Sequence, residues 1–260
     1  YNVSSLKSLP VVFTKIMAAD IPWYYQTGTR HFHYMHTPTK LYGTWTINQY
    51  LMAALLWNVN LDSTKFIDNY FDLYYPTTKQ TTRKFYEQLE FATANIKALK
   101  HNVDTKPWGY NLASRLLKGD LFSLDHLKYE ETHPQLNDAP DVVEMMDAMD
   151  LAKQYLDQSF VDCKDLIEQQ RLLEDKQRFD YGYSMYRYIF HMIRTSMFHK
   201  AGDTAMAKRE FKIVEKYADQ LKNMVDVVSV ASEDADSPNG FEAAQSVAVF
   251  EEFKKLYDPQ

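Results

Sequence analysis

The chain has 260 residues, of which 45% are hydrophobic and 25% are charged, and its formal net charge is −6. It contains 7 glycines, whereas an average soluble chain of this length carries roughly 18. Glycine permits the tight turns, bulges and phosphate-binding loops that other residues resist. The composition therefore argues against a sandwich, a barrel of hairpins and a glycine-loop nucleotide fold, and favours helices joined by few connections.

Charge and cysteine content exclude further classes. With 29 Lys+Arg against 35 Asp+Glu, the chain lacks the basic stripe of a nucleic-acid-binding protein, so no nucleic-acid partner is expected. No apolar run approaches the roughly 18 residues that suggest a membrane span, so none is predicted. Cys163 is the only cysteine and excludes an internal disulfide. No cofactor is predicted, because no Walker loop, dinucleotide fingerprint or HExxH motif occurs.

The first 76 residues predict three helices. Residues 4–20 are apolar and predict a helix that Pro10 interrupts or delays. Residues 45–57 predict a strongly apolar helix. Asp62 is expected to cap a third helix, which ends at Tyr75 because a proline follows.

A histidine-rich segment, RHFHYMH at residues 30–36, separates the first two of these helices. The alternation of histidines with aromatic or apolar residues is typical of a β-strand, and a strand would place His31 and His33 on one face. A lone strand leaves its backbone hydrogen bonds unmade, so the segment either pairs with strands outside this chain or forms an ordered loop. Two imidazoles on one face suit a metal, but His36 has the wrong parity to be a third ligand. We therefore favour buried or groove-lining histidines and predict no metal site.

Long helical periods fill most of the remaining chain. Apolar residues recur at steps of three and four in residues 78–101, 140–160, 165–200, 204–230 and 241–257. The 165–200 segment is the most regular and is expected at the centre, whereas residues 101–140 predict an extended connection. Short connections favour antiparallel neighbours. The sequence thus predicts a mainly α fold, an antiparallel helical bundle.

Acidic residues are candidate catalytic groups, because a glycosidase needs two carboxylates that face each other across the scissile bond. They fall at positions expected to be exposed on helices, with Lys or Arg three or four residues away. One such ladder comprises Arg171, Glu174, Asp175 and Arg178. Arg187 and Arg194, seven residues apart, are expected to share a helix face and either to pair internally or to bind an acidic partner. The residues themselves contain no convincing catalytic constellation.

Aromatic side chains are concentrated between residues 23 and 50. They are Trp23, Tyr24, Tyr25, Phe32, Tyr34, Tyr42, Trp45 and Tyr50. Aromatic rings can stack on the C–H faces of sugars, and Trp, Tyr and His add hydrogen bonds to hydroxyl groups. The same rings are also ordinary core residues, so both interpretations stay open from the residues alone.

Several long motifs resemble one family. They are GTRHFHYMHTPTKLYGTWTINQYLMAALLWN, FIDNYFDLYYP, TRKFYEQLEFATANIKALKH, LLEDKQRFDYGYSMYRYIFHMIRTSMFH and NGFEAAQSVAVF. Together they are similar to the distal part of bacterial alpha-glucuronidase-like proteins of polysaccharide degradation, a family mostly described as a domain of unknown function. In that family a (β/α)8 barrel, itself similar to glycoside hydrolases, precedes a helical C-terminal region.

The resemblance implies a division of the chain and a location for the protein. Residues 1–76 would include the end of the barrel, and residues 77–260 would form the helical domain. The catalytic carboxylates would lie on barrel strands before residue 1, so enzymatic activity of this chain alone stays open. The protein would be periplasmic or extracellular, with the preceding barrel as its partner.

Our hypothesis is that the chain is the C-terminal helical portion of a glycoside-hydrolase-like protein and lines a carbohydrate-binding cleft, with an acidic oligosaccharide as one candidate ligand. The predicted sugar contacts are Trp23, Tyr24, Tyr25, His31, His33 and Trp45. The alternative is a non-catalytic helical module for protein–protein interaction, in which the aromatic residues pack a core or dock a partner.

Overall fold

The computed structural model describes residues 11–31, 45–94, 142–228 and 250–257. The helices are α1 (Thr14–Gln26), α2 (Thr46–Trp57), α3 (Ser63–Tyr74), α4 (Lys79–Thr93), α7 (Val142–Asp162), α8 (Leu166–Lys200) and α9 (Thr204–Val228). Residues 250–257 are also helical, and the described ranges contain no β-strand. The prediction of a mainly α fold is confirmed. Most of the predicted strand, with His33, lies outside the described residues, as does the 101–140 connection.

Local sequence signals begin and end these helices. Asp62 and Asp165 cap α3 and α8 by accepting backbone N–H groups of the first turns at 3.1 and 2.8 Å. Gly202 ends α8 with φ 77, a left-handed conformation that glycine adopts without strain. Asp203 then accepts an N–H group from the first turn of α9 at 3.1 Å. The predicted cap at Asp62 is confirmed.

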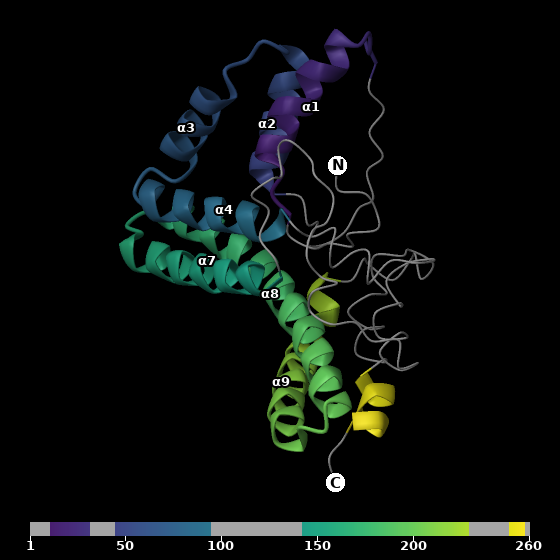
Figure 1. Cartoon of the computed structure of the whole chain (residues 1–260). Coiled ribbons are helices and arrows are strands. Elements are labelled where there is room, and N and C mark those ends of the chain that lie inside the picture. Colours follow the sequence, from purple (N-terminus) through teal and green to yellow (C-terminus); the bar gives the residue numbers. More distant parts are fainter. Residues whose placement is uncertain (1–10, 32–44, 95–141, 229–249, 258–260) are drawn as a thin grey trace.

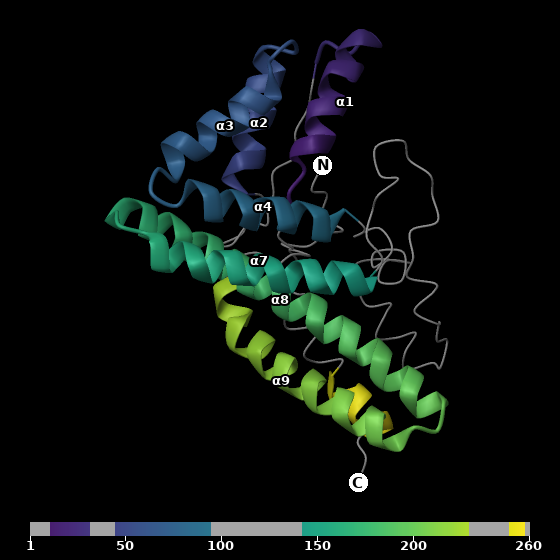
Figure 2. The same cartoon turned by 60° about the vertical axis from the view of Figure 1, so that its left-hand side comes forward.

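Neighbouring helices pack in antiparallel pairs, with α4 lying on α7 and α8 on α9 (Figure 1 and Figure 2). Thr82, near the start of α4, bonds Ser159, near the end of α7, at 3.2 Å. Glu210, near the start of α9, accepts a hydrogen bond from Arg194, near the end of α8, at 2.9 Å. The α1 and α2 helices pack on each other and stand across α4 (Figure 2).

The larger apolar core extends from α3 through α4 and α7 to α8 and α9. The ring of Phe85 lies 5.8 Å from that of Trp45 and 5.4 Å from that of Phe179, so it links the N-terminal helices to α8. A smaller core joins α1 to α2 through Met17, Ile21, Leu51 and Leu55, among other side chains. The larger core therefore includes side chains from both sides of residue 76, the predicted domain boundary.

Three acidic residues that were expected on exposed helix faces are buried. Glu168, Asp175 and Glu210 expose 0%, 3% and 4% of their surface. The interpretation of the 171–178 ladder as a surface feature is therefore wrong for Asp175, whose carboxylate turns into the core toward two tyrosines. The spacing of apolar residues alone could not show that Asp175 is buried, because α8 buries residues on several of its sides.

The arginines of α8 pair inside the protein. Arg187 forms an ion pair with Asp150 of α7, and Arg194 bonds Glu210 of α9 at 2.9 Å. Internal pairing was one of the two predicted outcomes for these arginines, and it is confirmed.

Candidate functional site

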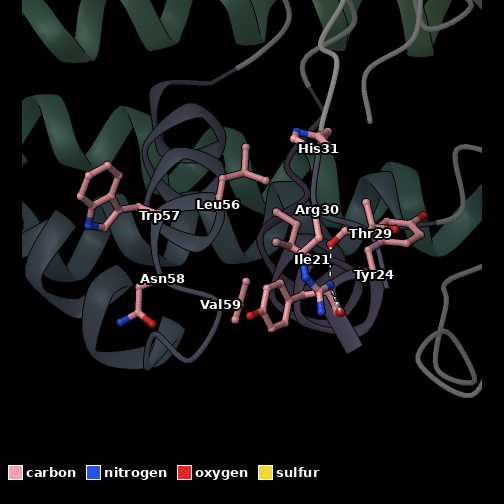
Figure 3. Close-up of a pocket in the computed structure, with 10 residues that line it drawn as sticks. Ile21, Tyr24, Thr29, Arg30, His31, Leu56, Trp57, Asn58 and Val59 are labelled. Carbon is pink, nitrogen blue, oxygen red and sulfur yellow. Dashed lines mark hydrogen bonds between the residues drawn. The ribbon is translucent and has the colours of Figure 1, made fainter. Parts of the chain in front are cut away.

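A pocket with a volume of about 260 Å³ lies between the C-terminal ends of α1 and α2 (Figure 3). Tyr24, Tyr25 and His31 line one side, and Leu56 and Trp57 line the other. The rings are accessible, since Tyr24, Tyr25 and Trp57 expose 37%, 45% and 92% of their surface. The volume is slightly below the range of about 300–1,000 Å³ that is usual for small-molecule sites. Such a pocket can hold a small ring or one unit of a longer ligand.

A sharp turn after α1 forms one wall of the pocket. Thr29 donates its N–H to the carbonyl of Tyr24 at 2.9 Å, which closes the end of the helix. Gly28 adopts φ 104, a conformation that a side chain resists, and it reverses the chain at this point. The reversal returns Arg30 and His31 to the tyrosines of α1 (Figure 3).

Arg30 fixes the geometry of Tyr25. Its Nη1 donates to the backbone carbonyls of Tyr25 at 2.6 Å and Thr29 at 2.9 Å. Its guanidinium carbon lies 4.1 Å from the centre of the Tyr25 ring, within the range of a cation–π contact. The contact covers part of one ring face and places a permanent cation in the pocket lining. Arg30 was not among the predicted sugar contacts, although it directly follows the glycine turn.

The end of α2 forms the opposite wall. Leu51 and Leu55 share a face and are buried against α1. Leu56 and Trp57 therefore point outward, and α2 ends at Trp57. Trp57 was not among the predicted contacts either, and the four-residue spacing of the two buried leucines was the signal that could have indicated its exposure.

The structure brings together only part of the predicted sugar-contact set. Tyr24, Tyr25 and His31 line the pocket, and Trp23 lies next to it with its ring 5.3 Å from that of Tyr24. Trp23 exposes 57% of its surface but is not part of the lining. His33 lies outside the described residues.

Trp45 occupies a different environment from the other predicted contacts. It is fully buried, with edge-to-face contacts to Phe85 at 5.8 Å and Tyr86 at 5.3 Å. Burying a large aromatic ring is strongly favourable, and the ring then has no face open to a ligand. Trp45 is a core residue in this structure and does not reach the pocket.

The pocket lining supplies aromatic faces, a guanidinium group, an imidazole and an amide, but no carboxylate. In the part of the chain that the structure describes, no three His, Cys, Asp or Glu side chains gather around a common point that could hold a metal ion. Within the same residues, no helix has both the length and the apolar composition to cross a membrane.

No protein-family model, curated protein or solved structure matches the chain. The pocket and the residues that line it are therefore the basis for a functional assignment.

Proposed function

We propose that the chain binds carbohydrate through the pocket between α1 and α2. The observation that carries the proposal is a pocket whose lining combines the accessible ring of Tyr25 with Arg30, His31 and Asn58, with the exposed indole of Trp57 at its edge (Figure 3). Flat aromatic faces suit the C–H faces of a sugar, and the polar side chains suit its hydroxyl groups. Large aromatic side chains gathered at an exposed pocket also mark binding surfaces more generally.

The wider assignment rests on the family resemblance. In this proposal the chain is the C-terminal helical portion, an antiparallel bundle, of a periplasmic or extracellular glycoside-hydrolase-like protein. A preceding (β/α)8 barrel, whose end lies within residues 1–76, supplies the catalytic carboxylates. The cationic Arg30 in the lining suits an acidic oligosaccharide, and the lack of a carboxylate in that lining is consistent with catalysis elsewhere.

Glycan binding by three single variants tests the proposal. Tyr25→Ala removes a ring from the α1 wall, Trp57→Ala removes the exposed ring at the end of α2, and Tyr50→Ala removes an exposed ring of α2 that does not line the pocket. Titration calorimetry would compare neutral oligosaccharides with oligosaccharides that carry uronic acids. We expect each pocket variant to lose about tenfold in affinity, which corresponds to about 1.4 kcal/mol, and Tyr50→Ala to retain it. Equal affinity in all three variants, or no binding by the unmodified protein, would refute the proposal.

A second candidate is the helical interaction module. Val161, Leu166 and Ile167, around the turn between α7 and α8, expose 77%, 82% and 64% of their surface. An exposed apolar cluster is a feature of docking surfaces. If docking is the function, Leu166→Ser with Ile167→Ser should lower self-association in sedimentation experiments and leave glycan affinity unchanged. Unchanged sedimentation of the double variant would count against this candidate.

A further inference from the structure

A carboxyl group lies inside the joint between α8 and the α3–α4 corner, which we define as residues 75–78. Asp175 of α8 exposes 3% of its surface. Its Oδ2 accepts the hydroxyl of Tyr75, in the corner, at 2.5 Å and the hydroxyl of Tyr86, on α4, at 2.9 Å. These two hydroxyl oxygens lie 3.2 Å apart. A single carboxyl group therefore ties the corner and α4 to α8.

Asp175 belongs to a row of side chains that hold this joint. One turn before Asp175 on the same face of α8, Arg171 donates to the carbonyl of Tyr74 at 2.7 Å. Two turns before it, Glu168 accepts hydrogen bonds from Thr77 and Thr78. Glu168 is also buried, but its carboxylate accepts two backbone N–H groups and two hydroxyls. Asp175 lacks such compensation, because its acceptor bonds come from two neutral phenols.

The charged neighbours of Asp175 only partly offset its burial. Arg178 places Nη1 at 3.6 Å from Oδ1, but the same guanidinium also pairs with Glu174 at 3.6 Å. Burial raises the pKa of Asp175 from its ordinary value of 3.8 to about 7, although the two phenol hydrogen bonds and Arg178 act to lower it. The Glu174 carboxylate adds to the rise in this pKa.

The phenols around Asp175 stay protonated when it ionises. They come from three parts of the fold: Tyr70 from α3, Tyr75 from the corner and Tyr86 from α4. Burial raises the pKa of each above its ordinary value of 10.0, and the charge of Asp175 raises it further. The proton exchanged by this cluster near neutral pH is therefore the proton of the Asp175 carboxyl group.

We propose that Asp175 is a proton-dependent latch, which holds the α3–α4 corner against α8 when its carboxyl group is neutral and loosens this joint when the group is ionised. A neutral acid fits an aromatic enclosure, whereas a carboxylate that is poorly paired there loses its hydration without full replacement. Between the ordinary and the raised pKa, the folded protein binds a proton that the unfolded chain releases. The stability that Asp175 contributes therefore falls as pH rises through this interval.

The variant Asp175→Asn isolates this effect, because an amide keeps the shape and one acceptor oxygen but cannot ionise. Asp180→Asn is the matched control: it lies on the same helix, its side chain is 33% exposed, and it pairs with Lys176. Urea midpoints of the three proteins would be measured at about pH 5, 6.5 and 8. We expect the midpoint of the unmodified protein to fall relative to Asp175→Asn as pH rises, and Asp180→Asn to follow the unmodified protein. A difference that stays constant with pH, or changes in the opposite direction, would overturn the proposal.

A titration of the unmodified protein keeps the proposal testable if Asp175→Asn does not fold. The carboxyl carbon of Asp175 would be followed by NMR, with its resonance assigned from the shift caused by Tyr86→Phe. We expect the carboxyl carbon to titrate with a midpoint near neutral pH. Above that pH, the amides of Tyr75 and Thr78 should exchange hydrogen faster, after correction for intrinsic exchange rates. A midpoint near the ordinary value of 3.8 would exclude the latch.

Discussion

Replacing Glu168 with alanine should destabilise the protein by about 2–4 kcal/mol, and the contacts of its carboxylate show why. The two oxygens accept the N–H groups of Thr77 at 3.0 Å and Thr78 at 2.8 Å, and both hydroxyls of these threonines. Thr77 is exposed, so water can replace its bonds after the substitution. Thr78 exposes 2%, and its hydroxyl can still bond Thr82 at 2.8 Å, but its N–H group loses its acceptor.

The expected loss of stability in Glu168→Ala follows from the different exposure of Thr77 and Thr78. An unsatisfied buried donor costs about 1–3 kcal/mol, and exchanging charge-assisted bonds for water at Thr77 adds about 1 kcal/mol. The negative charge also lies at the N-terminal end of α4, where it is favourable for the helix. The backbone donors of this helix start are thus satisfied by a side chain from α8, 90 residues away in the sequence for Thr78.

Urea unfolding followed by circular dichroism at pH 7 would measure the effect. Glu174→Ala is the control, because its side chain is 51% exposed and its contact with Arg178 is long at 3.6 Å. A change below about 0.5 kcal/mol is expected there. Faster hydrogen exchange of the Thr78 amide should accompany the loss of stability in Glu168→Ala. If the two variants lose the same stability, Glu168 does not organise the start of α4, and this account of the joint is wrong.

Three further substitutions test other parts of the structure. Trp45→Ala should cost about 3–5 kcal/mol in urea unfolding without changing glycan affinity, and a loss of affinity at unchanged stability would make Trp45 a ligand contact instead. Although burial acts to raise it, hydrogen bonds from His191 and Arg194 hold the pKa of Glu210 below its ordinary value. The stability from this group is therefore present above the ordinary pKa and lost as pH falls. Glu210→Gln should flatten the decline in stability between about pH 5 and 3, and an unchanged decline would exclude this role. Gly202→Ala should cost about 1–2 kcal/mol because φ is 77, and since a Cβ there meets no atom within 4 Å, Gly202→Asn should cost less.

The helices and their ends could be predicted because their signals are local. Asp62, Asp165 and Gly202 act within one turn of their own positions, so their neighbours in the sequence suffice. The environment of Asp175 could not be predicted in this way. Its partner Tyr75 lies 100 residues away, and the direction in which a polar side chain of α8 points depends on what packs there.

In the candidate site too, some features follow from local sequence signals and others depend on contacts with distant residues. Tyr24, Tyr25 and His31, three of the predicted sugar contacts, line one pocket. The helix that carries the two tyrosines was predicted to end at residue 20, but α1 continues through Pro22 to Gln26. Proline usually interrupts a helix because it lacks an N–H group. Here Ile21 is buried against α2, and this packing outweighs the lost hydrogen bond.

Residues that never touch the pocket position its α1 wall. Asn48 of α2 accepts the N–H group of Phe13 at 3.0 Å and donates to the carbonyl of Val11 at 2.8 Å, and it is fully buried. Glu90 of α4 accepts the hydroxyl of Thr14 at 2.6 Å and the N–H group of Lys15 at 2.8 Å. Both anchors lie at the start of α1, whereas the pocket lies at its other end. Because α1 is one continuous helix from Thr14 to Gln26, fixing its start also fixes where Tyr24 and Tyr25 lie relative to α2. The separation leaves the pocket end exposed and available to a ligand, while the polar contacts at the anchored end hold its geometry.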